Sequence, residues 1–124
     1  MIRVEDMHRH IERLLAPYTR TDIDDGIQVS WDRRVGRARV IRDLDGTVLE
    51  IQLAPIRSVV SYATALHELG HIWGRHQRSR SQAIRERWAW EWARRNALDW
   101  TPAMELCAVK ALAGCALRER RRQA

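Results

Sequence analysis

The first part of the chain has apolar residues at helical spacing. One face of a helix would collect Val4, Met7, Ile11, Leu14 and Leu15. Pro17 ends this pattern, because proline lacks the N–H that a helix interior needs. The spacing therefore predicts an amphipathic helix over residues 3 to 15, on which His8 and His10 are expected to be exposed.

From residue 26 the apolar positions alternate with polar ones, as in a strand with one buried face. The first such stretch contains Ile27, Val29 and Trp31. Two more apolar runs, Val40–Leu44 and Val48–Leu53, flank the pair Asp45-Gly46. This pair is typical of a type I′ hairpin turn, whose central residues have positive φ. We therefore expect a small three-stranded antiparallel sheet.

Helical spacing returns after Pro55. Ser58 or Ser61 can cap a helix whose apolar positions run from Val59 to Trp73, and Gly74 is its expected end.

Two more helices are expected to follow. The first opens at Ser79 or Ser81 and runs to about residue 98. The second opens at Thr101-Pro102, an N-cap followed by a proline in the first turn, and runs to about residue 118. The order predicts an α+β fold with helices packed on one face of the sheet, and residues 118–124 are expected to form a flexible basic tail.

Composition limits the class of protein. A length of 124 residues fits a single domain over residues 1–124, and 45% hydrophobic with 31% charged residues excludes a disordered chain. No apolar run reaches the roughly 18 residues of a membrane span, so we expect no membrane partner. The N-terminus is acidic where a signal peptide would be basic, which indicates a cytoplasmic protein.

The two cysteines and the net charge add little to the prediction of function. Cys107 and Cys115 would lie about 12 Å apart along one helix, too far for a disulfide. The net charge of +6 comes from arginines that are scattered, apart from the C-terminal group. Direct nucleic-acid binding is therefore not expected, although a basic nucleic-acid or protein-interaction module stays open as an alternative.

The strongest chemical signal is His67-Glu68-Leu69-Gly70-His71, an H-E-x-x-H motif. Two histidines four residues apart share one helix face, so both imidazoles can reach one zinc ion. Glu68 stands beside them as a candidate general base for a water molecule. The surrounding segment is strongly apolar, where two histidines without a ligand would be costly to bury. One zinc ion per chain is therefore expected.

A third protein ligand is needed, and the next helix offers Glu86 and Glu91. At about 100° per residue, Glu86 shares a face with small residues that permit close helix approach, while Glu91 lies about 140° away among arginines. Glu86 is therefore the expected ligand. His76 is a rival, because residues 67–76 nearly match the metzincin pattern H-E-x-x-H-x-x-G-x-x-H. Gln77 occupies the position where that pattern has its last histidine.

The motif and the helix that follows it resemble a known group of enzymes. His67–His71 together with Glu86–Ala93 is similar to the two zinc-binding helices of gluzincins, with Trp92 in place of a phenylalanine. The order of elements most resembles the ImmA/IrrE family of metallopeptidases, over about residues 26–102. The resemblance implies a minimal zincin-like catalytic domain, such as a phage or mobile element encodes.

The resemblance also implies roles and a substrate. His67, His71 and Glu86 would bind zinc, and Glu68 would be the catalytic base of an endopeptidase. Relatives cleave helix-turn-helix repressors, so a DNA-binding repressor is the implied substrate. If the strand Val48–Leu53 lies at a sheet edge, a substrate peptide can pair with it. A zinc-binding protein without catalysis and a metzincin-like peptidase using His76 remain the alternatives, and the oligomeric state is left open.

Overall fold

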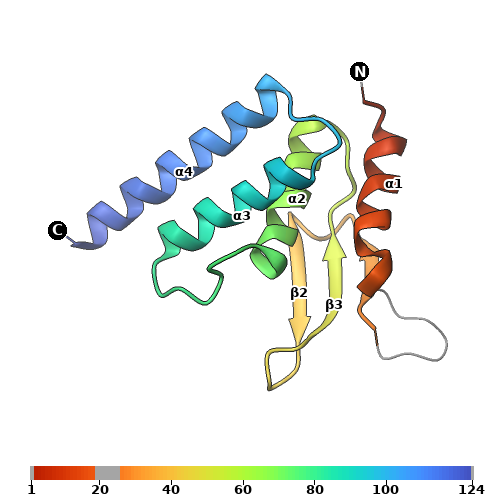
Figure 1. Ribbon diagram of the computed structural model, residues 1–124, viewed down its shortest axis with the longest axis horizontal. Coiled ribbons are helices and arrows are strands. Elements are labelled where there is room, and N and C mark those ends of the chain that lie inside the picture. Colours follow the sequence, from red (N-terminus) through yellow and green to blue (C-terminus); the bar gives the residue numbers. More distant parts are fainter. Residues whose placement is uncertain (1, 19–25, 124) are drawn as a thin grey trace. The chain divides into compact units, whose positions relative to one another are not determined.

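The computed structural model describes residues 2–18 and 26–123 of the chain. Contacts between residues divide it into two compact units, Met1–Arg57 and Ser58–Ala124, and each is described by itself. The single domain over residues 1–124 therefore stays a prediction. The α+β class and the order of helices and strands are as the sequence predicted (Figure 1).

The first unit opens with helix α1, Val4–Leu15, and the short 3-10 turn η1, Ala16–Tyr18. The predicted amphipathic helix is confirmed. The expectation of two exposed histidines is wrong for His10, which is only 9% exposed because it follows Met7 by three residues on the buried face. Burial, followed by the charge of Arg13, lowers the pKa of His10. His8 is half-buried, and its Nε2 accepts the N–H of Ile56 at 3.2 Å.

The three strands of this unit are β1, Gln28–Trp31, β2, Ala38–Arg42, and β3, Val48–Leu53. Their order across the sheet is β1-β3-β2, with β1 parallel and β2 antiparallel to β3. The sheet is therefore mixed, and the expectation of a wholly antiparallel sheet is corrected. The condition for peptide pairing on Val48–Leu53 also fails, because β3 is the central strand and has a partner on each side.

The connection between β1 and β2 explains this arrangement. Trp31 at the end of β1 and Ala38 at the start of β2 are both register partners of Leu53. Residues 32–37 therefore pass the end of β3 and do not fold back as a hairpin. Backbone bonds hold the crossing, since Asp32 N donates to the Leu53 carbonyl at 2.9 Å. β3 also has the buried side chains of the sheet, Ile51 and Leu53, which suits a central strand.

The β2–β3 hairpin was predicted, but its turn differs from the type I′ turn expected at Asp45-Gly46. Gly46 has a φ of 84°, whereas Asp45 is not among the residues with positive φ. The Gly46 N–H donates to the Asp43 carbonyl at 3.1 Å. The Asp43 carboxylate accepts the N–H groups of Asp45 and Thr47 at 2.9 Å each. A longer loop with one left-handed glycine, ordered by Asp43, therefore closes the hairpin.

The second unit begins with α2, Val59–Trp73. Both candidate caps take part, because the Ser58 hydroxyl accepts the Ser61 N–H and the Ser61 hydroxyl accepts the Ser58 N–H. Gly74 ends the helix as predicted, and its N–H donates to the Gly70 carbonyl at 2.7 Å. The buried residues of α2 are Tyr62, Ala63, Ala65, Leu66, His67, Leu69 and Gly70.

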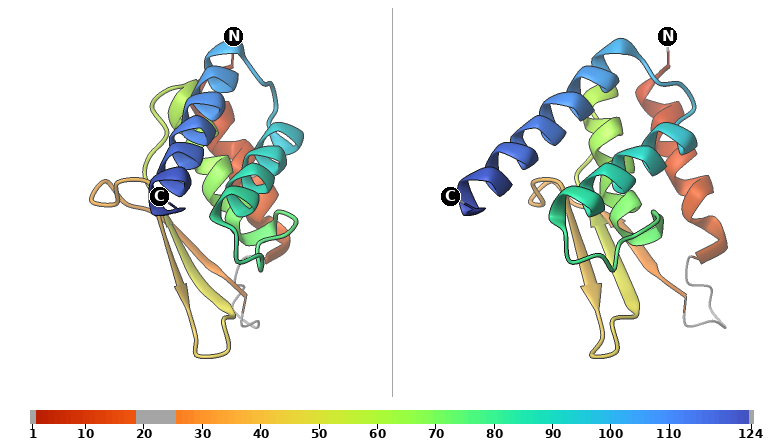
Figure 2. Two further views of the ribbon diagram at one scale, coloured as in Figure 1. Left: turned by 90° about the vertical axis from the view of Figure 1, so that its left-hand side faces the viewer. Right: turned by 60° about the vertical axis from the view of Figure 1, so that its left-hand side comes forward.

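Helix α3, Gln82–Asn96, starts at the cap Ser81, and α4, Pro102–Gln123, starts after Thr101. The two helices run in opposite directions (Figure 2). Arg94 on α3 pairs with Glu105 on α4 at 2.7 Å, and at the other end Gln82 accepts from Arg122 at 3.3 Å. These contacts fix α4 along α3 within the second unit.

Helix α4 is longer than the sequence predicted. Residues 118–123, which we expected in a flexible tail, continue the helix, and the Glu119 carboxylate accepts the N–H of Ala83 near the start of α3 at 2.9 Å. Cys107 and Cys115 are both free thiols, as expected. Over residues 2–18 and 26–123, every helix is too short or too polar to cross a membrane.

Candidate metal centre

Helices α2 and α3 lie against each other (Figure 1), and a glycine of the H-E-x-x-H motif is at a point of close contact. A Cβ atom added to Gly70 would clash with the backbone of Ala89, whose Cα would be 2.9 Å away. Ala89 and Ala93 on α3 are fully buried, and Trp90 is 2% exposed. These residues lie on the helix face on which the sequence predicted Glu86. The absence of a side chain at Gly70 brings the two helix backbones together.

The three expected ligands meet at this contact. Nε2 of His67 is 2.7 Å from one Glu86 oxygen, and Nε2 of His71 is 3.0 Å from the other. The two Nε2 atoms are themselves 3.1 Å apart. His67 is the most buried of the three, with a side chain 8% exposed, against 27% for His71 and 20% for Glu86. The cluster is therefore buried at His67 and partly open to solvent at His71 and Glu86.

The electrostatics follow from this packing. Burial opposes the charged form of His67, but its interactions with the carboxylates of Glu68 and Glu86 outweigh this effect, so the pKa of His67 is raised. Burial likewise opposes the charged form of Glu86. Hydrogen bonds from His67 and His71, with their charges, outweigh that effect and hold the pKa of Glu86 far below its usual range. Glu86 is therefore an anion that faces two ring nitrogens.

This donor set fits a divalent metal ion. Two imidazole nitrogens and a carboxylate have ligand atoms within 4.8 Å of one another. In a tetrahedral site with bonds of about 2.0–2.1 Å, neighbouring ligand atoms are about 3.3 Å apart, close to the 3.1 Å between the two Nε2 atoms. The nitrogens favour a transition metal over magnesium or calcium. The group can therefore hold a metal ion.

Two residues that the sequence reasoning did not assign to the site hold the histidine rings. Trp90 stacks on His67 with ring centroids 4.2 Å apart and an angle of 13°. Gln77 Oε1 is 3.0 Å from Nδ1 of His71. In the sequence, Gln77 stood out only as the residue in place of the last metzincin histidine. The signal available for Trp90 was its place one turn after Glu86 on the same helix face.

Glu68 occupies a different place from the three ligands. One of its carboxylate oxygens is 3.5 Å from Nδ1 of His67, the ring nitrogen opposite the one that faces Glu86. That distance is longer than a normal hydrogen bond, and the Glu68 side chain is 22% exposed. The contact of Glu68 is thus with the back of a ligand ring, and its role as a base stays a prediction.

The rival ligands lie elsewhere. Glu91 pairs with Arg95 at 3.3 Å and with Arg94 at 3.5 Å, as expected for an acid among arginines. His76 is exposed, has a φ of 59° and packs against Trp88 with ring centroids 4.8 Å apart. Over the described part of the chain, the group able to hold a metal contains neither residue.

Tyr62 on α2 is a core residue. Its side chain is fully buried, and its hydroxyl accepts the N–H of Leu98 at 3.0 Å. Tyr18, the other tyrosine of the chain, belongs to η1 in the first unit and is 46% exposed.

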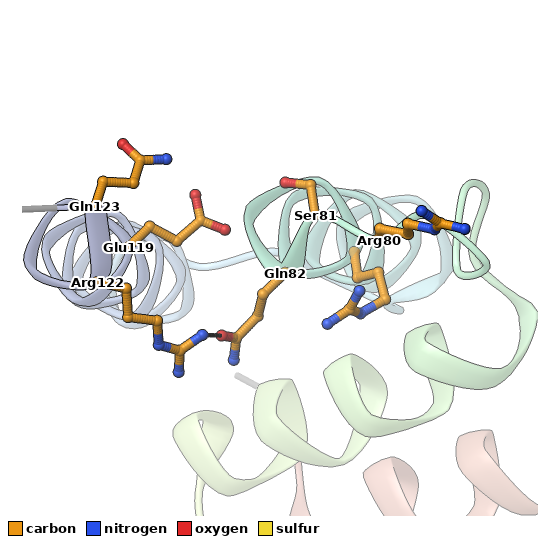
Figure 3. A pocket seen from close by; sticks show the side chains of 7 residues that line it. Arg80, Ser81, Gln82, Glu119, Arg122 and Gln123 are labelled. Carbon is orange, nitrogen blue, oxygen red and sulfur yellow. Dashed lines mark hydrogen bonds between the residues drawn. The ribbon is translucent and has the colours of Figure 1, made fainter.

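A polar cavity of about 330 Å³ lies where the start of α3 meets the end of α4 (Figure 3). It is lined by Arg80, Ser81, Gln82, Arg85, Glu119, Arg122 and Gln123. Several of these polar groups already bind each other or the α3 backbone. None of the three clustered residues lines this cavity, so it is separate from the candidate metal centre.

Comparison of the chain with protein-family models, with curated proteins and with solved structures finds no match.

Proposed function

We propose that this protein is a zinc-dependent metallopeptidase of the H-E-x-x-H type. The observation that carries the proposal is the convergence of two Nε2 atoms and one carboxylate, with His67, His71 and Glu86 within 4.8 Å of each other. Three protein ligands of this kind are typical of catalytic zinc sites, which keep one position for water or substrate. The resemblance to ImmA/IrrE metallopeptidases supports the same chemistry and a cytoplasmic protein.

In the proposed reaction, the metal ion and Glu68 have different roles. A zinc ion held here would supply Lewis acidity, which lowers the pKa of a water molecule and polarises a carbonyl. Glu68 would act as the base that takes a proton from the attacking water molecule, and would give a proton to the amine that leaves when the C–N bond breaks. The weak 3.5 Å contact of Glu68 with His67 and its partial exposure support a side chain able to turn toward a substrate.

The test separates metal binding from catalysis. Elemental analysis of the purified chain should find about one zinc per chain, and Glu68→Gln should keep it. Loss of the base should lower hydrolysis of an unfolded protein such as casein by about 10²–10⁴-fold. Glu91→Gln, on the same helix as Glu86 but ion-paired with Arg94 and Arg95, is the matched control and should keep full activity. Undiminished cleavage by Glu68→Gln, or cleavage that survives a chelator, would contradict the proposal.

A metal-binding module without hydrolysis is the second candidate. It is favoured by the position of Glu68 behind His67, where a carboxylate orients a ligand ring. In that case Glu68→Gln would weaken zinc binding, and neither protein would cleave any substrate.

For the substrate, we propose an acidic or acid-flanked protein, and by the family resemblance a helix-turn-helix repressor. Between residues 75 and 95 the chain has seven arginines, at 75, 78, 80, 85, 87, 94 and 95, against the acids Glu86 and Glu91. Such a surface attracts acidic partners. Incubation of the zinc form with a repressor encoded beside its gene, with Glu68→Gln as control, should give a discrete cut. An intact repressor alongside degraded casein would contradict this substrate.

A further inference from the structure

We propose that Gln77 is the positioning residue that fixes the ring of His71 for metal binding; this rests on the metal site proposed above. Gln77 lies in the loop after α2, six residues beyond His71. Its side chain is in contact with the His71 ring on one side and with backbone carbonyls on the other.

The hydrogen bonds define which way the amide faces. Nε2 of Gln77 donates to the carbonyl of Arg85 at 2.8 Å and to that of Arg75 at 3.2 Å. A carbonyl only accepts, so both contacts require the NH₂ end of the amide. The oxygen Oε1 must therefore be the end that faces His71, at 3.0 Å.

The amide then selects the tautomer of the imidazole. An oxygen at 3.0 Å from Nδ1 needs a donor, so Nδ1 of His71 carries the proton. A histidine that binds a metal ion does so as a neutral imidazole, and with the proton on Nδ1 its lone pair is on Nε2. Nε2 is the atom that lies 3.0 Å from Glu86 and 3.1 Å from Nε2 of His67. Gln77 thereby turns the ligating nitrogen toward the other two ligands.

The same side chain couples the two ligand helices. Arg85, whose carbonyl takes the shorter bond from Gln77, immediately precedes Glu86 on α3. A single amide therefore links the ring of a ligand on α2 to the backbone beside the ligand on α3. Groups that orient a metal-bound histidine in this way typically change metal affinity by about 10–100-fold when they are removed.

The test measures zinc affinity of the full chain by competition with a chelator. Gln77→Leu removes both the acceptor and the amide N–H groups, and we expect zinc binding about 10–100-fold weaker. Gln77→Glu keeps an oxygen acceptor for Nδ1 but places a second oxygen against the two carbonyls, and we expect a loss of affinity that is clearly smaller than in Gln77→Leu, about 10-fold or less. Gln82→Leu, which lies on α3 and bonds Arg122, is the control and should bind as wild type.

A second readout is the visible spectrum of the cobalt-substituted protein, which reports coordination geometry. It should change more in Gln77→Leu than in Gln77→Glu. If Gln77→Leu fails to fold, Gln77→Ala takes its place, because it adds no apolar bulk.

The outcomes separate the two proposals. Equal loss in the Leu and Glu variants would overturn the positioning role, since it would assign the whole effect to the bonds of Gln77 with the Arg75 and Arg85 carbonyls. Unchanged affinity in Gln77→Leu would overturn it as well, while leaving the zinc site of the wild type intact. A wild-type chain that binds no zinc would overturn both the metal site and this inference.

Discussion

Gly70 on α2 lies directly against the backbone of Ala89 on α3, at a separation that no side chain at residue 70 can enter. The candidate ligands lie within one helical turn of this contact: His67 precedes Gly70 by three residues, His71 follows it, and Glu86 precedes Ala89 by three residues. The geometry of the candidate metal centre therefore depends on a glycine that binds nothing itself.

Gly70→Ala should destabilise the protein even though alanine is the better helix former. The gain in helix propensity is about 1 kcal/mol, but the new methyl group would meet backbone atoms of Ala89, which cannot rotate away. We expect a net loss of about 1–3 kcal/mol in the free energy of unfolding, together with weaker zinc binding. Urea unfolding and chelator competition measure the two effects.

Gly114→Ala is the matched control for this substitution. Gly114 also lies inside a helix, α4, but an added Cβ would meet only the end of the Arg118 side chain at 3.5 Å, an ordinary contact. We expect this variant to gain up to about 1 kcal/mol in stability and to keep its zinc. A Gly70→Ala protein that gains stability as Gly114→Ala does would show that the helices do not pack as closely as described.

The pair of His67 and Glu86 predicts a specific pH dependence for the metal-free protein. At His67 the interactions with carboxylates outweigh burial, so its pKa is raised. The stabilisation that His67 contributes is therefore fully present below about pH 6.5, its ordinary pKa, and is lost as the pH rises through the raised pKa. The pKa of Glu86 is lowered, because hydrogen bonds from the histidines outweigh its burial. The stabilisation that Glu86 contributes is fully present above pH 4.5, its ordinary pKa, and falls as the pH decreases below that value.

The measurement is the difference in unfolding free energy between wild type and Glu86→Gln, with a chelator present, from pH 3 to about pH 9. The difference should be largest between about pH 4.5 and 6.5 and decline on both sides. His10 has a lowered pKa, so it destabilises the fold as the pH falls. Both proteins keep His10, so its effect cancels in the difference. A difference that is flat across this range would contradict the pairing.

The fold shows what local patterns do and do not encode. Helix and strand positions follow from apolar spacing and caps, so α1 and β3 were predicted to within a residue. The order of the strands in the sheet was not predicted correctly. Alternation in Gln28–Trp31 predicts a strand but not the strand it pairs with, and the parallel pairing with β3 depends on how residues 32–37 cross the sheet. The end of α4 also escaped prediction, because Glu119 interacts with Ala83, far away in sequence.

The candidate site divides in the same way. His67 and His71 follow from the spacing of two residues on one helix, and Glu86 from the small residues that share its helix face. Gln77 could not be predicted, because its role depends on a loop conformation that brings its amide between the His71 ring and the Arg85 carbonyl. No spacing rule describes a loop of this kind.

Tyr62→Phe tests whether this tyrosine is structural. The substitution removes the hydroxyl that accepts the Leu98 N–H at 3.0 Å and keeps the buried ring. We expect a loss of about 1 kcal/mol in the free energy of unfolding, with zinc content and peptide hydrolysis unchanged. A large fall in kcat with stability preserved would instead make Tyr62 part of the catalytic machinery.

Glu119→Ala tests whether the last turns of α4 belong to the folded unit. The Glu119 carboxylate accepts the N–H of Ala83 in the first turn of α3 at 2.9 Å, where a negative charge is favoured by the helix dipole. Removal of this contact should lower the free energy of unfolding by about 0.5–2 kcal/mol. Arg120→Ala, an exposed neighbour on the same helix, is the control and should change stability by less than about 0.5 kcal/mol. Equal stability of the two variants would mean that residues 118–123 do not hold α3 in solution.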